Sequence, residues 1–537
     1  EEAYEVVDAI EGLDPDDPAS DVELIGELGD LLYQIEFHAT IAEQEGRFTI
    51  ADVTSAVHDK LVRRHPHVFG DTIVTDADSV TANWERLKRA ERSPEASVFD
   101  GVPGSLPALS LADTVQRKAA KVGFDWPEVD GALAKIGEEA AEVVAARARF
   151  LPIVHRAEML GELMRLRWSI AVAGTHGKTT TTSLVATMLN GAGIDPTVIN
   201  GGIITGWGSN ARLGSGKWMV VEADESDGSF AKLKPTVAVV TNIDPEHLDH
   251  HGSFERLETA FSNFVASIPF YGFATLCIDH PAVQRLMAGI KDRRIVTYGM
   301  SANADVRAVN IRAEAGHMLF TVHLSDRIGT PSTNLDEVRF PMLGEHNVQN
   351  CLAAIAVALE MNIAPAKITA ALASFGGVGR RFETKGVSGG VTIIDDYGHH
   401  PVEIRAALKA GRMLCGTNRL IAIVQPHRYS RLADLFDDFC SCFNDADEVL
   451  VADVYAAGET PIDGVNKDAL VDGLRDYGHK AAAALAGPEK LAAEIAARTK
   501  PGDVVMCLGA GDITAWAAAL PAALDAVDKA RASEAAS

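Results

Sequence analysis

Apolar residues along most of the chain form short continuous runs separated by stretches of helical spacing, a pattern typical of doubly wound α/β proteins. The run at residues 170–173 predicts a buried strand, and a helix should follow it, with apolar positions at Leu184, Val185, Met188 and Leu189. Further buried strands are predicted at residues 218–222, 237–241, 391–394, 420–424, 449–454 and 504–508. We therefore expect two successive sheets covered by helices, an α/β fold, from residue 168 to the C-terminus.

The first 142 residues have a different pattern, which predicts long helices. One helix should run from about residue 21 to residue 45. Glu2 and Glu5 lie three positions apart, as do Glu27 and Asp30, so each pair shares one helical face. Two facing helices of this kind could hold Mg²⁺ with four carboxylates, whereas two solvated acidic faces would explain the same pattern without a metal.

Composition narrows the class of function. The formal net charge of −26 would repel nucleic acids and anionic membranes, so we expect neither as a partner. We predict a cytoplasmic location because the sequence has no apolar run of transmembrane length, no signal peptide and no Cys-x-x-Cys pair. The six cysteines, expected to be reduced, are Cys277, Cys351, Cys415, Cys440, Cys442 and Cys507.

A glycine-containing loop joins the strand at residues 170–173 to the helix after it. Gly174 and Gly177 let the backbone turn its N–H groups into one concavity, while Lys178 and the helix N-terminus add positive charge. The hydroxyl of Thr179 follows at the position that would hold Mg²⁺. An isolated Gly-Lys-Thr is more often a turn with an exposed lysine, but the flanking strand and helix favour a polyphosphate site here. The strict motif has glycine where this chain has Val172.

The sequence Gly-Thr-His-Gly-Lys-Thr-Thr-Thr-Thr closely resembles the loop of the Mur ligases, in particular that of their L-alanine-adding members. The resemblance extends from about residue 143 to the C-terminus. It implies a remnant of the family's N-terminal domain at 143–167, a central ATP-binding domain at 168–376 and a Rossmann-like C-terminal domain at 377–537. The residues implied to bind ATP are Gly174, Thr175, His176, Gly177, Lys178, Thr179, Thr180, Asn347, Asn350 and Arg380.

The same resemblance implies a ligase reaction of peptidoglycan precursor synthesis. ATP would activate the carboxylate of UDP-N-acetylmuramate as an acyl phosphate, and the amine of L-alanine would attack it to form an amide. Lys178, Glu222 and His247 would be catalytic, with Thr179, Glu222 and His247 holding Mg²⁺. The residues implied to bind L-alanine follow predicted strands and are Tyr397, His399, Arg428 and Arg431.

Several of these positions also have a simpler explanation. Glu222 could belong to a solvated turn, and His247 could be a surface histidine. Asn347 and Asn350 stand at the start of a predicted helix, where asparagines often act as caps. Arg428 and Arg431, three positions apart, could form a solvated helical face.

Residues 1–95 resemble the MazG family of nucleoside triphosphate pyrophosphohydrolases. Glu1-Glu2-x-x-Glu5 and Glu27-x-x-Asp30 match that family's EExxE and ExxD motifs, and residues 59–71 and 83–85 match further segments. The resemblance implies Mg²⁺ bound by Glu2, Glu5, Glu27 and Asp30, and a homodimer formed through these helices. Residues 96–142 resemble the start of a second such domain. Because the chain begins in mid-helix, we expect the start of the first to be missing.

The chain thus resembles a chimera of two truncated proteins. No G-x-G-x-x-G motif opening a βαβ unit precedes Ile170, so most of the UDP-binding domain of a Mur ligase is expected to be absent. The favoured function is an ATP-dependent amide ligase. The alternatives are an Mg²⁺-dependent nucleoside triphosphate pyrophosphohydrolase and an inactive chimera that only binds ATP.

Overall fold

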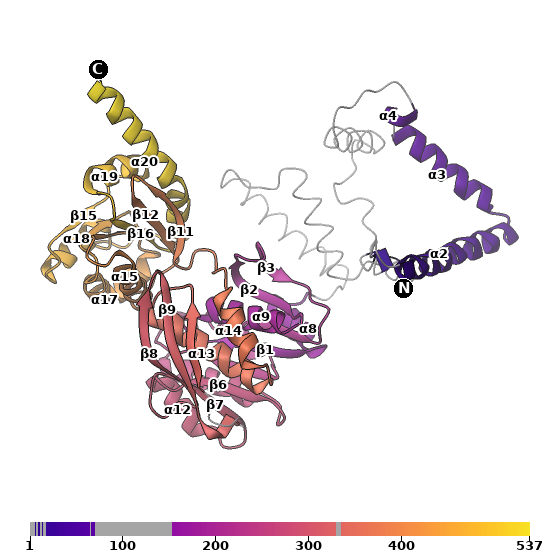
Figure 1. The fold of residues 1–537 in the computed structure, drawn as a ribbon, viewed down its shortest axis with the longest axis horizontal. Helices are drawn as coiled ribbons and strands as arrows, with labels where there is room; N and C mark the ends of the chain where they lie inside the picture. Colours follow the sequence, from indigo (N-terminus) through magenta and orange to yellow (C-terminus); the bar gives the residue numbers. More distant parts are fainter. Residues whose placement is uncertain are drawn as a thin grey trace. The chain divides into compact units, whose positions relative to one another are not determined.

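The computed structural model describes residues 18–64, 66–69, 153–328 and 334–536, together with four positions before residue 18. The chain divides into two units, Glu1–Leu151 and Pro152–Ser537, which are described separately (Figure 1). No helix within the described residues is long and apolar enough to cross a membrane.

The first unit contains the helices α2 (Pro18–Gln44), α3 (Ile50–Arg64) and α4 (Pro66–Phe69). Thr49 and Asp52 form the turn into α3, where each accepts a hydrogen bond from the backbone N–H of the other. Glu27 and Asp30 lie about one turn apart on α2, as predicted. Glu2, Glu5 and residues 70–152 lie outside the described residues, so the four-carboxylate magnesium site and the second MazG-like segment stay predictions.

The central sheet of the second unit has the strand order β10-β9-β8-β7-β6-β5-β1-β4-β2-β3 within the described residues. Strand β1 (Trp168–Ala173) pairs in parallel with β4 (Trp218–Glu222) and β5 (Val237–Val240), and their carboxyl ends meet at one edge. The other strands are β2 (Thr197–Ile204), β3 (Ser209–Arg212), β6 (Phe273–Cys277), β7 (Arg294–Gly299), β8 (Val306–Glu314), β9 (His317–Leu324) and β10 (Leu335–Phe340).

Helices cover both faces of this sheet because successive side chains of a strand point to opposite sides. Ile170 and Val172 of β1 pack into one core with α9 (Lys178–Gly191) and α13 (Glu345–Glu360). Ala171 and Ala173 pack into the opposite core with α11 (Phe254–Ala266) and α12 (Pro281–Gly289). The remaining helical elements are α8 (Arg156–Arg165), η1 (Ser229–Lys232), α10 (Leu248–His251), η2 (Asp326–Ile328) and α14 (Pro365–Ala373).

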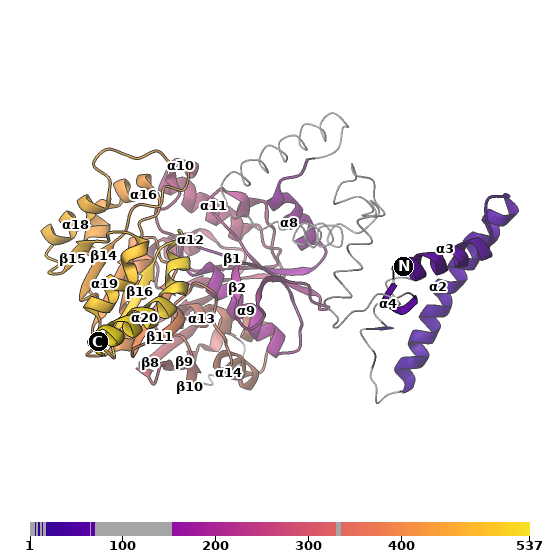
Figure 2. The same ribbon diagram turned by 90° about the horizontal axis from the view of Figure 1, so that it is seen from above.

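The C-terminal part forms a second sheet with the order β11-β12-β16-β13-β14-β15 (Figures 1 and 2). Its strands are β11 (Glu383–Ser388), β12 (Val391–Asp396), β13 (Leu420–Val424), β14 (Glu448–Val451), β15 (Ala482–Ala484) and β16 (Val504–Leu508). Its helical elements are α15 (Pro401–Cys415), α16 (Tyr429–Asp434), α17 (Phe436–Ser441), α18 (Lys467–Asp476), η3 (Pro488–Lys490), α19 (Leu491–Arg498) and α20 (Ile513–Ala536). The predicted α/β class is confirmed, with two sheets in succession and helices before them.

Candidate active site

The loop between β1 and α9 has a backbone that requires glycine at two positions. Gly174 has φ +135°, and a Cβ atom there would lie 2.0 Å from the Thr241 hydroxyl. Gly177 has φ +80°, and a Cβ atom would lie 2.5 Å from Oδ1 of Asn350. Gly177 is also the N-cap of α9 and has no side chain with which to cap it. The first N–H groups of α9 are therefore oriented for an anion, together with the positive end of the helix dipole.

Lys178 lies beneath this loop. Its Nζ donates to the carbonyl oxygen of Gly174 at 2.7 Å and to both carboxylate oxygens of Glu225 at 2.9 and 2.7 Å. Burial alone would lower the pKa of Lys178, but the Glu225 carboxylate raises it above its ordinary value. Burial in turn raises the pKa of Glu225 to about 7, against the opposing effect of Lys178. Lys178 is therefore held at the base of the loop in an ion pair with Glu225.

The oxygen ligands suited to Mg²⁺ lie together at the edge of the sheet. The Thr179 hydroxyl donates to Oε1 of Glu222 at 3.0 Å, and Oε2 of Glu222 accepts the Gly201 N–H at 2.6 Å. Among the described residues, no three His, Cys, Asp or Glu side chains form a metal cage by themselves. This arrangement fits Mg²⁺ because that ion is usually held by one or two protein oxygens, substrate phosphates and water.

A cavity of about 430 Å³, called the catalytic cavity below, lies between the two sheets. Its walls include the phosphate loop, the ends of β4 and β5, and the segments that follow β12 and β13. The predicted site residues that line it are Thr175, Gly177, Lys178, Thr179, Glu222, His247, Arg380, Tyr397, His399, Arg428 and Arg431. Segments that are far apart in the sequence therefore meet in one space.

The C-terminal wall of this cavity is built around an aromatic ring. The guanidinium carbons of Arg380 and Arg381 lie 4.8 and 4.9 Å from the centre of the Tyr397 ring. Arg380 also donates to the carbonyl oxygen of Gly509 at 3.0 Å, so its charge is partly engaged within the C-terminal sheet. Burial lowers the pKa of His399 to about 4, and its imidazole is therefore neutral at pH 7.

The Arg431 side chain, from α16 of the C-terminal part, contacts Glu246, which follows β5 of the central sheet. Its Nη2 lies 3.0 Å from Oε1 of Glu246, and the two side chains are 12 and 10% exposed. Arg431 is therefore part of a largely buried ion pair, and the solvated helical face considered as the alternative is wrong for this residue.

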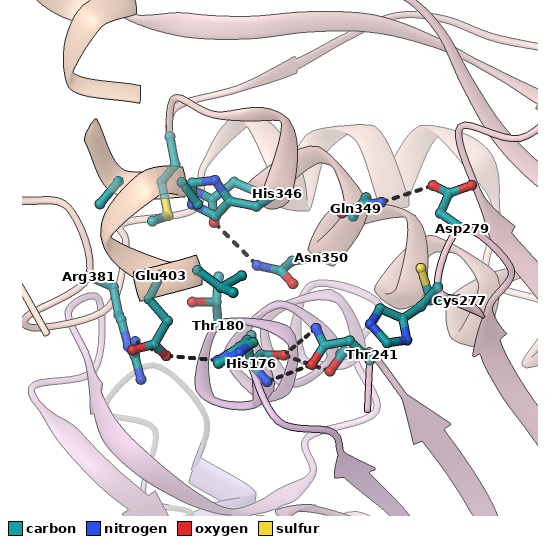
Figure 3. Close-up of a pocket in the computed structure, with 18 of the residues that line it drawn as sticks. His176, Thr180, Thr241, Cys277, Asp279, His346, Gln349, Asn350, Arg381 and Glu403 are labelled. Carbon is teal, nitrogen blue, oxygen red and sulfur yellow. Dashed lines mark hydrogen bonds and ion pairs between the residues drawn. The ribbon is translucent and has the colours of Figure 1, made fainter. Parts of the chain in front are cut away.

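A second cavity of about 270 Å³, the base cavity, adjoins the first and shares Gly177, Arg381 and Glu403 with it (Figure 3). His176, Thr180, Asn347 and Asn350, which are among the predicted nucleotide residues, line it. The two asparagines do not cap α13, whose N-cap is Gly344. Asn347 donates to the carbonyl oxygen of Leu343 at 2.8 Å, and Asn350 donates to Asn347 at 3.3 Å.

The His176 side chain points away from the loop, toward the carboxylates of Glu403 and Asp244. Nδ1 lies 3.3 Å from Oε1 of Glu403, and Nε2 lies 3.4 Å from Oδ2 of Asp244. Its backbone N–H is donated to Oδ1 of Asn242 at 2.7 Å. Burial alone would lower the pKa of His176, but the two carboxylates raise it to about 10. The imidazole is therefore positively charged at neutral pH.

Several site residues do not follow from the sequence motifs. Glu225 pairs with Lys178, Glu403 and Asp244 pair with His176, and Glu246 pairs with Arg431. Asp279 lines the base cavity and accepts a hydrogen bond from Gln349 at 2.9 Å (Figure 3). Apart from Glu403, which lies in the first turn of α15, these are polar residues shortly after a buried strand, a signal that indicates the sheet edge but not the partner.

The fold and this site define a class of protein: an α/β enzyme that binds a nucleoside triphosphate on a glycine loop and brings a second sheet over it. The model of the Mur ligase middle domain matches residues 172–358, and that of the Mur ligase glutamate ligase domain matches residues 380–511. The model of the MazG nucleotide pyrophosphohydrolase domain matches residues 1–69.

Individual relatives agree with these matches. The UDP-N-acetylmuramate–L-alanine ligase of Rhodospirillum centenum is 63% identical over 386 residues, which cover 72% of this chain and 80% of that protein. The corresponding ligase of Acidiphilium cryptum is 61% identical, with the same coverage. The crystal structure of the Thermotoga maritima UDP-N-acetylmuramate–alanine ligase superposes with a TM-score of 0.60 at 28% identity, covering 73% of this chain and 82% of that one. The chain therefore belongs to the Mur ligase family, in the group of UDP-N-acetylmuramate–L-alanine ligases.

Proposed function

We propose that the second unit joins L-alanine to UDP-N-acetylmuramate and converts ATP to ADP and phosphate. The main support is the catalytic cavity, which the phosphate loop lines together with Arg428 and Arg431. A nucleotide triphosphate and an amino acid carboxylate are both anions, and each has its own positive groups in this space. The names of the relatives supply the identity of the two joined substrates.

In the first step, the nucleotide base lies in the base cavity and the triphosphate lies along the N-terminus of α9. Lys178 and the backbone N–H groups hold the phosphate oxygens. Thr179 and Glu222 would hold Mg²⁺, which supplies neutralising charge to the transferred phosphoryl group. A carboxylate oxygen of UDP-N-acetylmuramate attacks the γ-phosphorus, and ADP leaves, so that an acyl phosphate forms.

In the second step, the amine of L-alanine attacks the carbonyl carbon of the acyl phosphate. The new C–N bond forms, the C–O bond to phosphate breaks, and the amine loses its extra protons to water or to the leaving phosphate. Arg428 holds the alanine carboxylate and so orients the amine, and Arg431, which pairs with Glu246, adds its remaining N–H donors. His399 stays neutral, because burial lowers its pKa, and therefore adds no charge that would repel the alanine ammonium group.

The proposal is tested by product formation in the full chain. UDP-N-acetylmuramate, L-alanine, ATP and Mg²⁺ should give a product heavier than UDP-N-acetylmuramate by one alanyl residue, detected by mass spectrometry. The product should be lost when Lys178→Ala is combined with Glu225→Gln, a pair of changes that leaves no unpaired charge at this buried position. A product formed at the same rate by this variant would refute the assigned role of Lys178.

A second candidate function is Mg²⁺-dependent cleavage of nucleoside triphosphates by the first unit. It is supported by the match of residues 1–69 to the MazG domain and by Glu27 and Asp30 on one face of α2. Glu27→Gln with Asp30→Asn should abolish pyrophosphate release from nucleoside triphosphates and leave the ligase product unchanged. If pyrophosphate release persists in this double variant, the hydrolase assignment is wrong.

We also propose that the first unit forms a homodimer and that the protein is cytoplasmic. Helix α2 exposes large apolar side chains, of which Val22, Ile25, Leu32 and Tyr33 are 69, 68, 59 and 63% exposed. Such a face is typical of an association surface. Ile25→Lys with Leu32→Lys should shift the sedimentation coefficient from that of a dimer to that of a monomer, and an unchanged value would contradict this interface.

The proposed cytoplasmic location is supported by the cysteines. All six are free and buried, which suits a reducing compartment.

A further inference from the structure

The two sheets of the second unit are joined by ion pairs of very different burial. His176 with Glu403 and Arg431 with Glu246 are largely buried, since each of these side chains is at most 13% exposed. Lys409 on α15 also pairs with Glu345 on α13, at 2.7 Å, but their side chains are 52 and 45% exposed. A buried pair is costly to separate, whereas an exposed pair contributes little. The buried pairs should therefore control how the C-terminal sheet sits over the loop.

Glu403 connects His176 to the segment that holds the predicted L-alanine residues. It lies in the first turn of α15, and its Oε2 accepts the backbone N–H groups of His399 and His400 at 3.2 and 3.4 Å. Its carboxylate also lies 3.3 Å from Nδ1 of His399. Any displacement of Glu403 must therefore move the chain at His399.

On the other side, His176 is fixed to the central sheet. Its imidazole lies between Glu403 and Asp244, a residue that follows β5, and His280 contacts the same Asp244 carboxylate at 3.2 Å. The ring of His176 also lies 5.1 Å from that of His400. Figure 3 shows the contact between Glu403 and His176 at the boundary of the base cavity.

We propose that His176 is a positioning residue, whose side chain joins the phosphate loop to Glu403 and so holds the C-terminal sheet closed over the catalytic cavity. The inference rests on the proposed function, since it has a side chain of the ATP loop position the segment that holds the predicted L-alanine residues. The imidazole lies within ion-pair distance of two carboxylates, that of Glu403 in α15 and that of Asp244 after β5. Without this imidazole, the carboxylates of Glu403 and Asp244 would lose the positive charge that they share.

The experiment measures the distance between the two sheets by single-molecule fluorescence energy transfer in the full, ligand-free chain. Lys291→Cys, between α12 and β7, and Lys480→Cys, between α18 and β15, place one dye at an exposed position beside each sheet. The natural cysteines are buried, so these two sites label selectively. The parent chain should show one short-distance population. His176→Ala should lower the ratio of closed to open molecules by about tenfold or more.

Two further variants separate positioning from a loss of folding. Glu403→Gln keeps an oxygen for the cap of α15 but removes the charge, and it should open the sheets to a similar extent. The double variant should open them no further than either single change, because both remove the same contact. Lys409→Gln is the matched control and should stay within about twofold of the parent.

An unchanged distance distribution in His176→Ala would overturn the inference, as would equal opening in Lys409→Gln. Binding of a non-hydrolysable ATP analogue is measured in parallel on the parent chain. If the analogue does not bind, the proposed function fails, whereas the distance distributions still decide whether His176 holds the sheets together.

Discussion

Lys178 and Glu225 form a buried ion pair beneath the phosphate loop, with Nζ 2.7 Å from Oε2 and side chains that are 13 and 1% exposed. The lysine that is predicted to meet the phosphates is thus already neutralised by a neighbouring carboxylate. Incoming phosphate must share this lysine with Glu225.

Removing the Glu225 charge should therefore destabilise the ligand-free chain and strengthen the stabilisation that a bound nucleotide gives. Glu225→Gln leaves Lys178 buried without a counter-charge and should lower the free energy of unfolding by about 3 kcal/mol. An ATP analogue should restore more stability to this variant than to the parent, because its phosphates replace the lost charge. Urea unfolding with and without the analogue measures both effects. Glu258→Gln, which removes a more exposed partner of Arg285, should change stability by less than about 1 kcal/mol; an equal loss in both variants would contradict the account.

The conformation of the loop gives a prediction with a close control. Gly177 and Gly193 have φ values of +80° and +83°, so alanine is strained at both. Only at Gly177 would the added Cβ atom meet another group, Oδ1 of Asn350 at 2.5 Å. Gly177→Ala should weaken binding of an ATP analogue by more than about tenfold, and Gly193→Ala should not change it. Calorimetric titration checks this, and equal affinity in the two variants would exclude the proposed loop geometry.

The charge of His176 predicts a pH dependence of stability. Its pKa in the folded chain is raised from 6.5 to about 10, so its stabilising contribution is complete below pH 6.5 and is lost as the pH rises toward 10. The parent should therefore exceed His176→Gln in thermal midpoint most at pH 6, and the difference should shrink steadily up to pH 10. A difference that stays constant over this range would show that the imidazole is not charged between Asp244 and Glu403.

The arginines of the C-terminal sheet predict a selective effect on L-alanine. Arg428→Lys keeps the charge but loses the two-pronged geometry suited to a carboxylate. We expect the KM for L-alanine to rise by about tenfold, with the KM for ATP unchanged within about twofold. Arg285→Lys, in a partly exposed pair with Glu258, is the control and should leave both constants unchanged. A rise in the KM for ATP alone would show that Arg428 does not bind the amino acid.

The apolar pattern predicts the parallel strands well because they are buried on both faces. The strands at 218–222, 420–424 and 504–508 begin and end where the apolar runs do. By contrast, β9 (His317–Leu324) alternates buried with more exposed positions, so it gives no continuous run. Strands β8 to β10 are antiparallel and do not follow from the apolar runs. The predicted domain boundaries stay predictions.

The candidate site follows from the sequence only as far as each motif reaches. Lys178 and Thr179 stand at the start of a predicted helix and Glu222 at the end of a predicted strand. The structure places all three around one cavity, although their roles stay predictions. The partners of these residues are set by the approach of the two sheets. His176 and Glu403 are 227 positions apart, and no local pattern indicates that they touch.

The most direct test of the ligase assignment is phosphate release from ATP by the full chain, measured with UDP-N-acetylmuramate and L-alanine together and with each alone. Release should require both substrates, exceed the rate with either one by about tenfold or more, and disappear in the variant that combines Lys178→Ala with Glu225→Gln. Phosphate release that neither substrate stimulates, in a chain that binds ATP, would contradict the assignment.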